Sequence, residues 1–113
     1  MDSHTLELLG VSKIKELVAA RAACSLGKEA ARALEPSRDP AEVAARHAVT
    51  TEMVEALRSG LRPPLGGLHD IRPLVRRAQV GAMLEAEELS QVAETLRSVA
   101  SLADWLERHG ENF

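Results

Sequence analysis

The stretch Ala86–His109 reads AEELSQVAETLRSVASLADWLERH and is the longest regular pattern in the sequence. Its apolar residues recur alternately every three and four positions, the spacing of a coiled-coil seam along one face of an α-helix. The members of this seam are Leu89, Val92, Leu96, Val99, Ala103 and Leu106. At 1.5 Å per residue the helix spans roughly 36 Å. The pattern therefore predicts a long C-terminal helix whose seam is covered by the helices upstream.

Two large apolar residues of this helix lie away from the seam. Leu102 and Trp105 are three positions apart, so they share one side of the helix near its C-terminal end. Burial of both is worth several kcal/mol, at roughly 25 cal/mol per Å². We therefore expect a second copy of the chain to cover them in a two-fold homodimer. The alternative is that Trp105 folds back onto the helices of its own chain.

Stop signals divide the sequence before Ala86 into shorter helices. Asp39, Pro40 and Glu42 form the clearest start, with an N-cap acid, proline at the first helical position and a carboxylate that reaches back to the cap. Pro36 ends the preceding segment, because the residue before a proline avoids the α region. The expected segments are 5–9, a helix capped by Ser12 that runs to about 22, 25–34, 40 to about 59, and 70–80.

The composition supports an all-α fold. Of the 113 residues, 45% are hydrophobic and only 2% aromatic, and Ala, Leu, Glu and Arg dominate. These residues favour helices over a sheet. The length suits a single helical domain over residues 1–113, because two domains would each be too small to bury a useful core. We therefore expect a bundle of about five helices.

The sequence also limits the classes of protein to which the chain can belong. Its single cysteine, Cys24, excludes an internal disulfide. No apolar run approaches the roughly 20 residues that cross a bilayer, and no signal-like segment follows Met1. The scarcity of aromatic rings argues against stacking on single-stranded nucleic acid. We therefore expect a cytoplasmic protein with no membrane partner.

Residues 60–69 are rich in proline and glycine, which excludes a regular helix or strand and predicts a loop. Asp70 then caps the helix that runs to Val80. Free amides at a helix N-terminus attract anions, but Asp70 places its own carboxylate where a phosphate would bind. We interpret this region as a structural loop that leads into an internally capped helix. Its defining residues are Pro64, Gly66, Gly67 and Asp70.

The search for chemistry finds no catalytic constellation. The four histidines lie far apart in the sequence, and a G-x-x-x-x-G-K-[ST] phosphate loop is missing. Cys24 follows an Ala-rich segment, where a cysteine usually acts as a small buried hydrophobe. We therefore expect no catalytic residue, no metal site and no cofactor in this chain.

The net charge of −3 conceals an uneven distribution. Between Arg58 and Arg77 five arginines stand against one acid, whereas the sequence from Glu85 onward is mainly acidic. Clustered arginine is the electrostatic footprint of nucleic-acid binding, although the same residues also pair with acids on neighbouring helices. The candidate nucleic-acid contacts are Arg58, Arg62, Arg72, Arg76 and Arg77.

Two stretches carry a resemblance to a known family. Residues 64–72 read PLGGLHDIR, and residues 25–29 upstream read SLGKE. Together with Leu34, Pro36 and Asp39 they resemble, in order and spacing, the N-terminal core-domain segment of the MutS type 2 family. Members of this family are paralogues of the mismatch-repair ATPase MutS. The resemblance covers nearly the whole chain.

The resemblance implies that the chain is a fragment of a longer DNA-processing protein, active in DNA repair or recombination control. It would be a non-catalytic helical core segment that connects to the lever and clamp arms, transmits conformation and contributes to clamp assembly. The remainder of the parent chain would bind ATP and Mg in an ATPase domain and, in many members, carry an Smr domain with endonuclease activity. Such a parent acts on branched DNA or on ribosomes, and the sequence leaves both open.

A second interpretation fits composition and periodicity equally well. The chain would then be a self-contained small helical adaptor that binds a protein partner through its last helix. The length of the parent reading frame discriminates the two. A continuation into a phosphate loop supports the first interpretation, and a stop after Phe113 supports the second.

Overall fold

Helices make up the regular structure of the computed structural model, which describes residues 2–113. Over these residues the chain forms six α-helices and a short 3-10 turn, with no strand. The elements are α1 (Ser3–Leu8), α2 (Val11–Arg21), α3 (Ser25–Arg32), α4 (Pro40–Arg58), α5 (Arg72–Gln79), α6 (Ala86–His109) and η1 (Gly110–Asn112). The predicted all-α class is confirmed, and so is the long C-terminal helix.

The helix starts follow local chemistry that the sequence displays in part. Asp39 caps α4 as predicted, because its Oδ1 accepts a hydrogen bond of 3.0 Å from the Ala41 amide behind Pro40. The start of α2 differs from the prediction. Gly10, in the left-handed conformation, takes the N-cap position that we expected Ser12 to hold. Glycine adopts this conformation without steric cost, so the chain turns sharply between α1 and α2.

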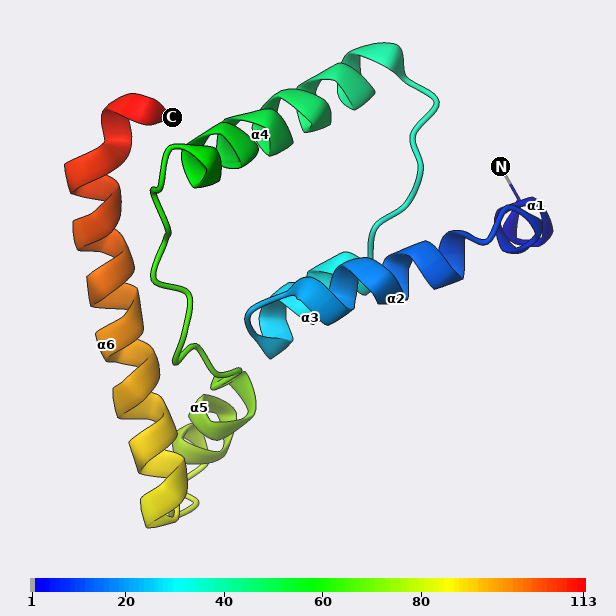
Figure 1. Cartoon of the computed structure of the whole chain (residues 1–113). Coiled ribbons are helices and arrows are strands. Elements are labelled where there is room, and N and C mark those ends of the chain that lie inside the picture. Colours follow the sequence, from blue (N-terminus) through cyan, green and yellow to red (C-terminus); the bar gives the residue numbers. More distant parts are fainter. Residues whose placement is uncertain (1) are drawn as a thin grey trace.

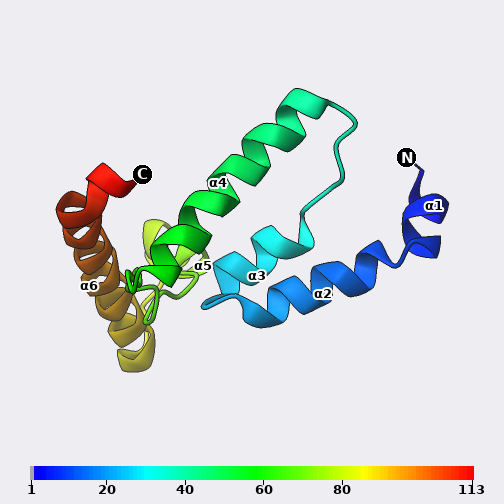
Figure 2. The ribbon, with the colours of Figure 1, turned by 45° about the horizontal axis from the view of Figure 1, so that its top comes forward.

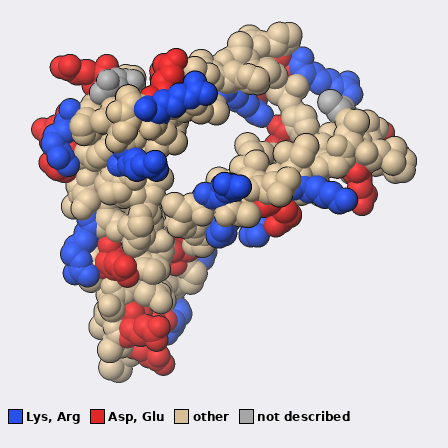
Figure 3. All heavy atoms as spheres, viewed as in Figure 1, with Lys and Arg blue, Asp and Glu red and all other residues tan. Residues whose placement is uncertain are grey.

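The helices are spread over an open frame (Figures 1 and 2). Helices α2 and α3 lie side by side as the most extensive helix pair of the described chain, and α4 reaches away from them beyond residues 33–39. Figure 3 shows an opening that side chains leave between α4 and the α2–α3 pair. The radius of gyration is 17.7 Å, against about 13 Å for a closely packed domain of this length.

An open frame encloses little interior. Within residues 2–113, the buried apolar residues are Ala19, Ala31, Ala56, Leu74 and Trp105. Three of these are alanines, which bury little apolar area each, and no large side chain is completely shielded from solvent. Most leucines, valines and methionines are therefore exposed or only half-buried. None of the described helices is long and apolar enough to cross a membrane.

The orientation of α6 is the main difference from the sequence prediction. The seam expected to face inward is exposed: Leu89 by 55%, Leu96 by 59%, Val99 by 51% and Leu106 by 47%. The buried residues of the helix are Thr95 and Trp105, on the side next to the seam. The prediction was wrong because the segment packed against α6 is a loop. Its free backbone groups need polar partners, and the seam has none.

Trp105 packs within its own chain, which is the alternative that the sequence left open. It is 7% exposed, and its ring centroid lies 5.2 Å from that of His109 and 5.7 Å from that of Phe113. Leu102, one turn earlier on the same side, is half-buried. The expected exposed strip of Leu102 and Trp105 is thus not present, and a homodimer through these two residues loses its basis.

Candidate functional site

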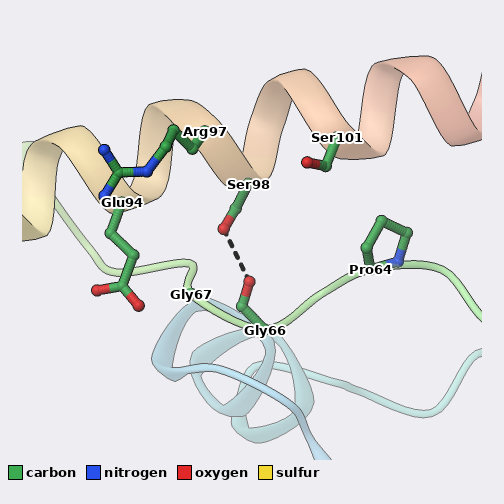
Figure 4. A pocket seen from close by; sticks show the side chains of 7 residues that line it. All are labelled: Pro64, Gly66, Gly67, Glu94, Arg97, Ser98 and Ser101. Carbon is green, nitrogen blue, oxygen red and sulfur yellow. Dashed lines mark hydrogen bonds between the residues drawn. The ribbon is translucent and has the colours of Figure 1, made fainter.

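The proline- and glycine-rich loop between α4 and α5 is fastened to the polar side of α6. Ser98 Oγ donates a hydrogen bond of 2.8 Å to the Gly66 carbonyl (Figure 4). The His69 amide donates one of 3.1 Å to Thr95 Oγ1. The His69 side chain lies with Nε2 2.8 Å from Glu94 Oε2. Three residues within little more than one turn of α6 therefore hold one short stretch of the loop.

At position 67 of this junction only glycine fits. Its φ is +80°, a left-handed conformation that is strained for any residue with a Cβ. A Cβ at Gly67 would lie 2.5 Å from Ser98 Oγ and 3.3 Å from Glu94 Cγ. The neighbouring Gly66 has no such constraint, because a Cβ there meets open space. Glycine is thus needed at position 67 for both its backbone and its contact with α6.

A shallow polar hollow of about 270 Å³ lies where the loop crosses α6 (Figure 4). Its lining comes from both segments: Pro64, Gly66, Gly67, Glu94, Arg97, Ser98 and Ser101. Ser98 is held by Gly66, and Glu94 is held by His69. Ser98 and Glu94 therefore position the loop at this hollow. Among residues 2–113, no three His, Cys, Asp or Glu side chains gather closely enough to hold a metal ion.

Arg72 joins the loop to the N-terminal half of the chain. Its Nε and Nη2 each donate a 2.8 Å hydrogen bond to the Asp70 carboxylate, and Nη2 donates another of 2.7 Å to Glu29 Oε2 on α3. The Arg72 guanidinium lowers the pKa of Asp70 from 3.8 to about 2, chiefly through these hydrogen bonds. The two carboxylates in turn raise the pKa of Arg72.

Asp70 also lies slightly before the position that the sequence assigned to it. Helix α5 begins at Arg72 with Ile71 as its N-cap, so Asp70, which the sequence predicted as the cap, stands one residue before the observed cap. Its Oδ1 nevertheless accepts a hydrogen bond of 3.1 Å from the Arg72 amide. The Asp70 carboxylate therefore accepts the hydrogen bond of the first amide of α5. This arrangement does not fit a nucleotide phosphate, whose negative charge the carboxylate would repel.

The five arginines predicted to contact nucleic acid differ in their ion-pair partners. Arg72 pairs with two acids, and Arg77 pairs with Glu88 at the start of α6. Arg58 and Arg62 form no ion pair with any residue of the described chain, and Arg76 acts on Asp70 only through its charge. On the face drawn in Figure 3, acidic and basic side chains are interspersed. On this face the cluster in the sequence therefore does not form one continuous basic surface.

Sequence reasoning missed one basic neighbour. Arg21, at the end of α2, lines the same open groove as Arg62, with Met53 and Leu57 of α4 as apolar walls. The groove has a volume of about 460 Å³. Arg21 and Arg62 are distant in the sequence and belong to no shared motif. Only the fold brings them to one place.

Curated proteins named Endonuclease MutS2 match nearly the whole chain. The protein from Symbiobacterium thermophilum is 44% identical over 107 residues, or 95% of this chain. The one from Exiguobacterium sibiricum is 38% identical over 112 residues, and the one from Acetivibrio thermocellus is 36% identical over 105 residues. The chain spans only 13–14% of the length of these relatives. No family model and no solved structure matches the chain.

We expect the three glycine substitutions Gly67→Ala, Gly81→Ala and Gly66→Ala to differ in a fixed order. Gly67→Ala adds left-handed strain and a clash with Ser98, so it lowers the free energy of unfolding by about 1–3 kcal/mol. Gly81 has φ +83° and open space, so its variant carries strain alone. Gly66→Ala is the control, and its free energy of unfolding should stay close to that of the unsubstituted chain. Urea denaturation measures all three, and equal stability of the Gly67 and Gly66 variants would contradict the fit.

The lowered pKa of Asp70 predicts an acid-sensitive contribution to stability. Because its pKa is about 2 in the folded chain and 3.8 ordinarily, the unfolded chain takes up the proton first. The contribution is therefore complete above about pH 4 and is lost as the pH falls through 2. Arg72→Met should flatten this part of the stability profile, and Arg58→Met should leave it unchanged. Urea denaturation between pH 2 and 5 measures this slope in both variants. The same slope in both would exclude the effect of Arg72.

Proposed function

This chain belongs to the MutS2 family, of which it forms an N-terminal segment, and on that basis we propose that it is the non-catalytic helical core segment of a MutS2-like DNA-processing protein. In this proposal the remainder of the protein binds ATP and Mg and carries the endonuclease activity that the relatives' names describe. The segment contributes to clamp assembly and transmits conformation, in the cytoplasm. The match over 95% of the chain supports this function above that of an independent adaptor.

The small interior of the chain supports a role as part of a larger body. On α2, Ile14 is 57% exposed and Leu17 70% exposed. Ile14 and Val18 line an apolar groove of about 320 Å³, which Leu34 and Pro36 close from the far side. Contiguous exposed apolar surface marks a place where another segment packs. We infer that lever or ATPase-domain helices of the parent complete this face.

The transmission of conformation has a continuous chain of contacts to support it. Ser98 and Thr95 on α6 hold the loop, and the loop places Asp70 against Arg72. Arg72 then reaches Glu29 on α3. A displacement of α6 would have to move the loop, and with it this ion pair. The link between distant elements thus passes through two or three polar contacts, each of which a substitution can remove.

A chimera tests the proposed function. The matching segment of the Symbiobacterium thermophilum protein is replaced by this chain, and nuclease activity on branched DNA is measured. We expect activity within a few fold of the unmodified protein, and a loss of at least tenfold with Ile14→Glu, because Ile14 is then buried by the parent. Lys13→Glu, its exposed neighbour, is the control. In the isolated chain Ile14→Glu should leave the helical circular dichroism unchanged. Unchanged nuclease activity of the chimera with Ile14→Glu would contradict the inference that the rest of the longer protein covers this face.

We further propose that nucleic acid contacts this segment at Arg58 and Arg62, which form no ion pair within residues 2–113. Binding to phosphates is weak, independent of sequence and salt-sensitive, because it releases counterions. Fluorescence anisotropy with a DNA duplex and an RNA hairpin at low salt should show a several-fold weaker affinity for Arg58→Ala/Arg62→Ala. Arg77→Ala, which removes an arginine already paired with Glu88, is the control. No binding of either nucleic acid at low salt would dispose of the contact.

A further inference from the structure

Two apolar grooves lie at the two ends of the opening between α2 and α4 that Figure 3 shows. The first has residues of α2 in its walls, together with Arg46 near the start of α4. The second joins Arg21, at the end of α2, to Met53 and Leu57 near the end of α4. Helices α2 and α4 run in the same direction in Figures 1 and 2. The two grooves are therefore the ends of one trough, the α2–α4 trough, which has a helix along each side.

Each wall of the α2–α4 trough is one stripe of a helix. The residues of both stripes recur every three or four positions, which is the spacing of a single helix face. The stripe on α2 consists of Val11, Ile14, Val18 and Arg21, and the stripe on α4 runs through Arg46, Val49, Met53 and Leu57. Each stripe is about 15–17 Å long at 1.5 Å per residue. The trough therefore has the length of about three helical turns.

The end of the trough beside the loop is basic. Arg21 and Arg62 form no ion pair within residues 2–113, and no acidic side chain is among the described residues that line this groove. Next to the residues of α4, its apolar lining is Ala23, Pro63 and Leu65. The opposite end carries both signs of charge, since Glu35 and Lys15 both line it. An occupant therefore needs an apolar face along its length and negative charge at the end near Arg21.

An amphipathic helix meets both requirements. Three turns of such a helix place an apolar stripe against the two walls, and carboxylates on its flank reach the arginines. A nucleic acid fits less well, because it carries phosphate along its whole length and the walls are apolar. No aromatic ring lines either groove to stack on its bases. The chemistry of the trough therefore favours a polypeptide helix.

We propose that one acidic amphipathic helix of about three turns, from the remainder of the longer protein, lies in the α2–α4 trough with carboxylates at Arg21 and Arg62. The source of this helix rests on the proposed function, in which the chain is one segment of a longer protein. The helix covers Met53 and Leu57, which are 36% and 41% exposed, as well as the apolar face of α2. Because Arg62 then holds a carboxylate, the helix and the nucleic acid proposed above compete for it.

Thiol labelling tests whether the trough is occupied. In a Cys24→Ser background, Leu57→Cys is reacted with a maleimide in the isolated chain and in the chimera described above, and mass spectrometry measures labelling at position 57. We expect labelling to be at least tenfold slower in the chimera, because the helix covers this position there. Arg58→Cys, an exposed neighbour outside the groove, is the control and should be labelled equally fast in both. Equal rates at position 57 in the chain and the chimera would overturn the proposal.

Fluorescence anisotropy tests the acidity of the helix. The probe is a labelled synthetic helical peptide of about four turns, with one leucine stripe flanked by glutamates, and a second peptide has lysine in place of each glutamate. We expect the isolated chain to bind the acidic peptide at least tenfold more tightly, and Arg21→Glu to remove this preference. Arg58→Glu makes the same charge change outside the trough and should keep it. No binding of the acidic peptide, or equal binding of both peptides, would overturn the proposal.

Labelling and nuclease activity separate this helix from the proposed function. A chimera with nuclease activity and a reactive position 57 would overturn the helix and leave the function standing. A protected position 57 in an inactive chimera would support the helix and contradict the function. Labelling of the isolated chain that slows at high chain concentration would assign the trough to a second copy, and labelling that slows with a DNA duplex would assign it to nucleic acid. Either result would overturn the helix.

Discussion

The attachment of the proline- and glycine-rich loop to α6 is the interaction on which the rest of this structure depends. Thr95 and Ser98 satisfy backbone groups of the loop that would otherwise lack partners. Because these residues face the loop, most of the apolar seam of α6, about a quarter turn around the helix, is left exposed. The same attachment fixes where Asp70 and Arg72 stand, and so determines that Arg72 meets Glu29 of α3.

This constraint explains why the chain encloses so little interior. The longest apolar stripe in the sequence is directed to solvent, and the residues that replace it against the loop are mostly polar. The remaining buried side chains are mainly alanines with one leucine and one tryptophan. Hydrophobic burial is the dominant favourable contribution to folding. Such a chain gains stability when other surfaces cover α2 and α6, as expected for a segment that spans about a seventh of its relatives.

Local chemistry accounts for the parts of the fold that the sequence predicted. Asp39 and Pro40 define the start of α4 through contacts within three residues, and prolines and glycines define the loop. The unpredicted parts depend on residues far apart in the chain. Nothing local to Arg72 indicates a partner 43 positions away, and nothing local to Gly67 indicates Ser98. Periodicity showed that α6 has an apolar face, but not whether that face meets the chain or solvent.

The heat capacity change of unfolding tests most directly the claim that the chain leaves its apolar faces uncovered. A globular domain of 113 residues gives about 1.4–1.7 kcal/mol/K, since apolar surface exposed on unfolding dominates this quantity. Scanning calorimetry of the chain at low concentration measures this change. The account predicts a value clearly below about 1 kcal/mol/K. A value in the range of an ordinary globular domain would show that the chain buries a complete core of its own, and would contradict it.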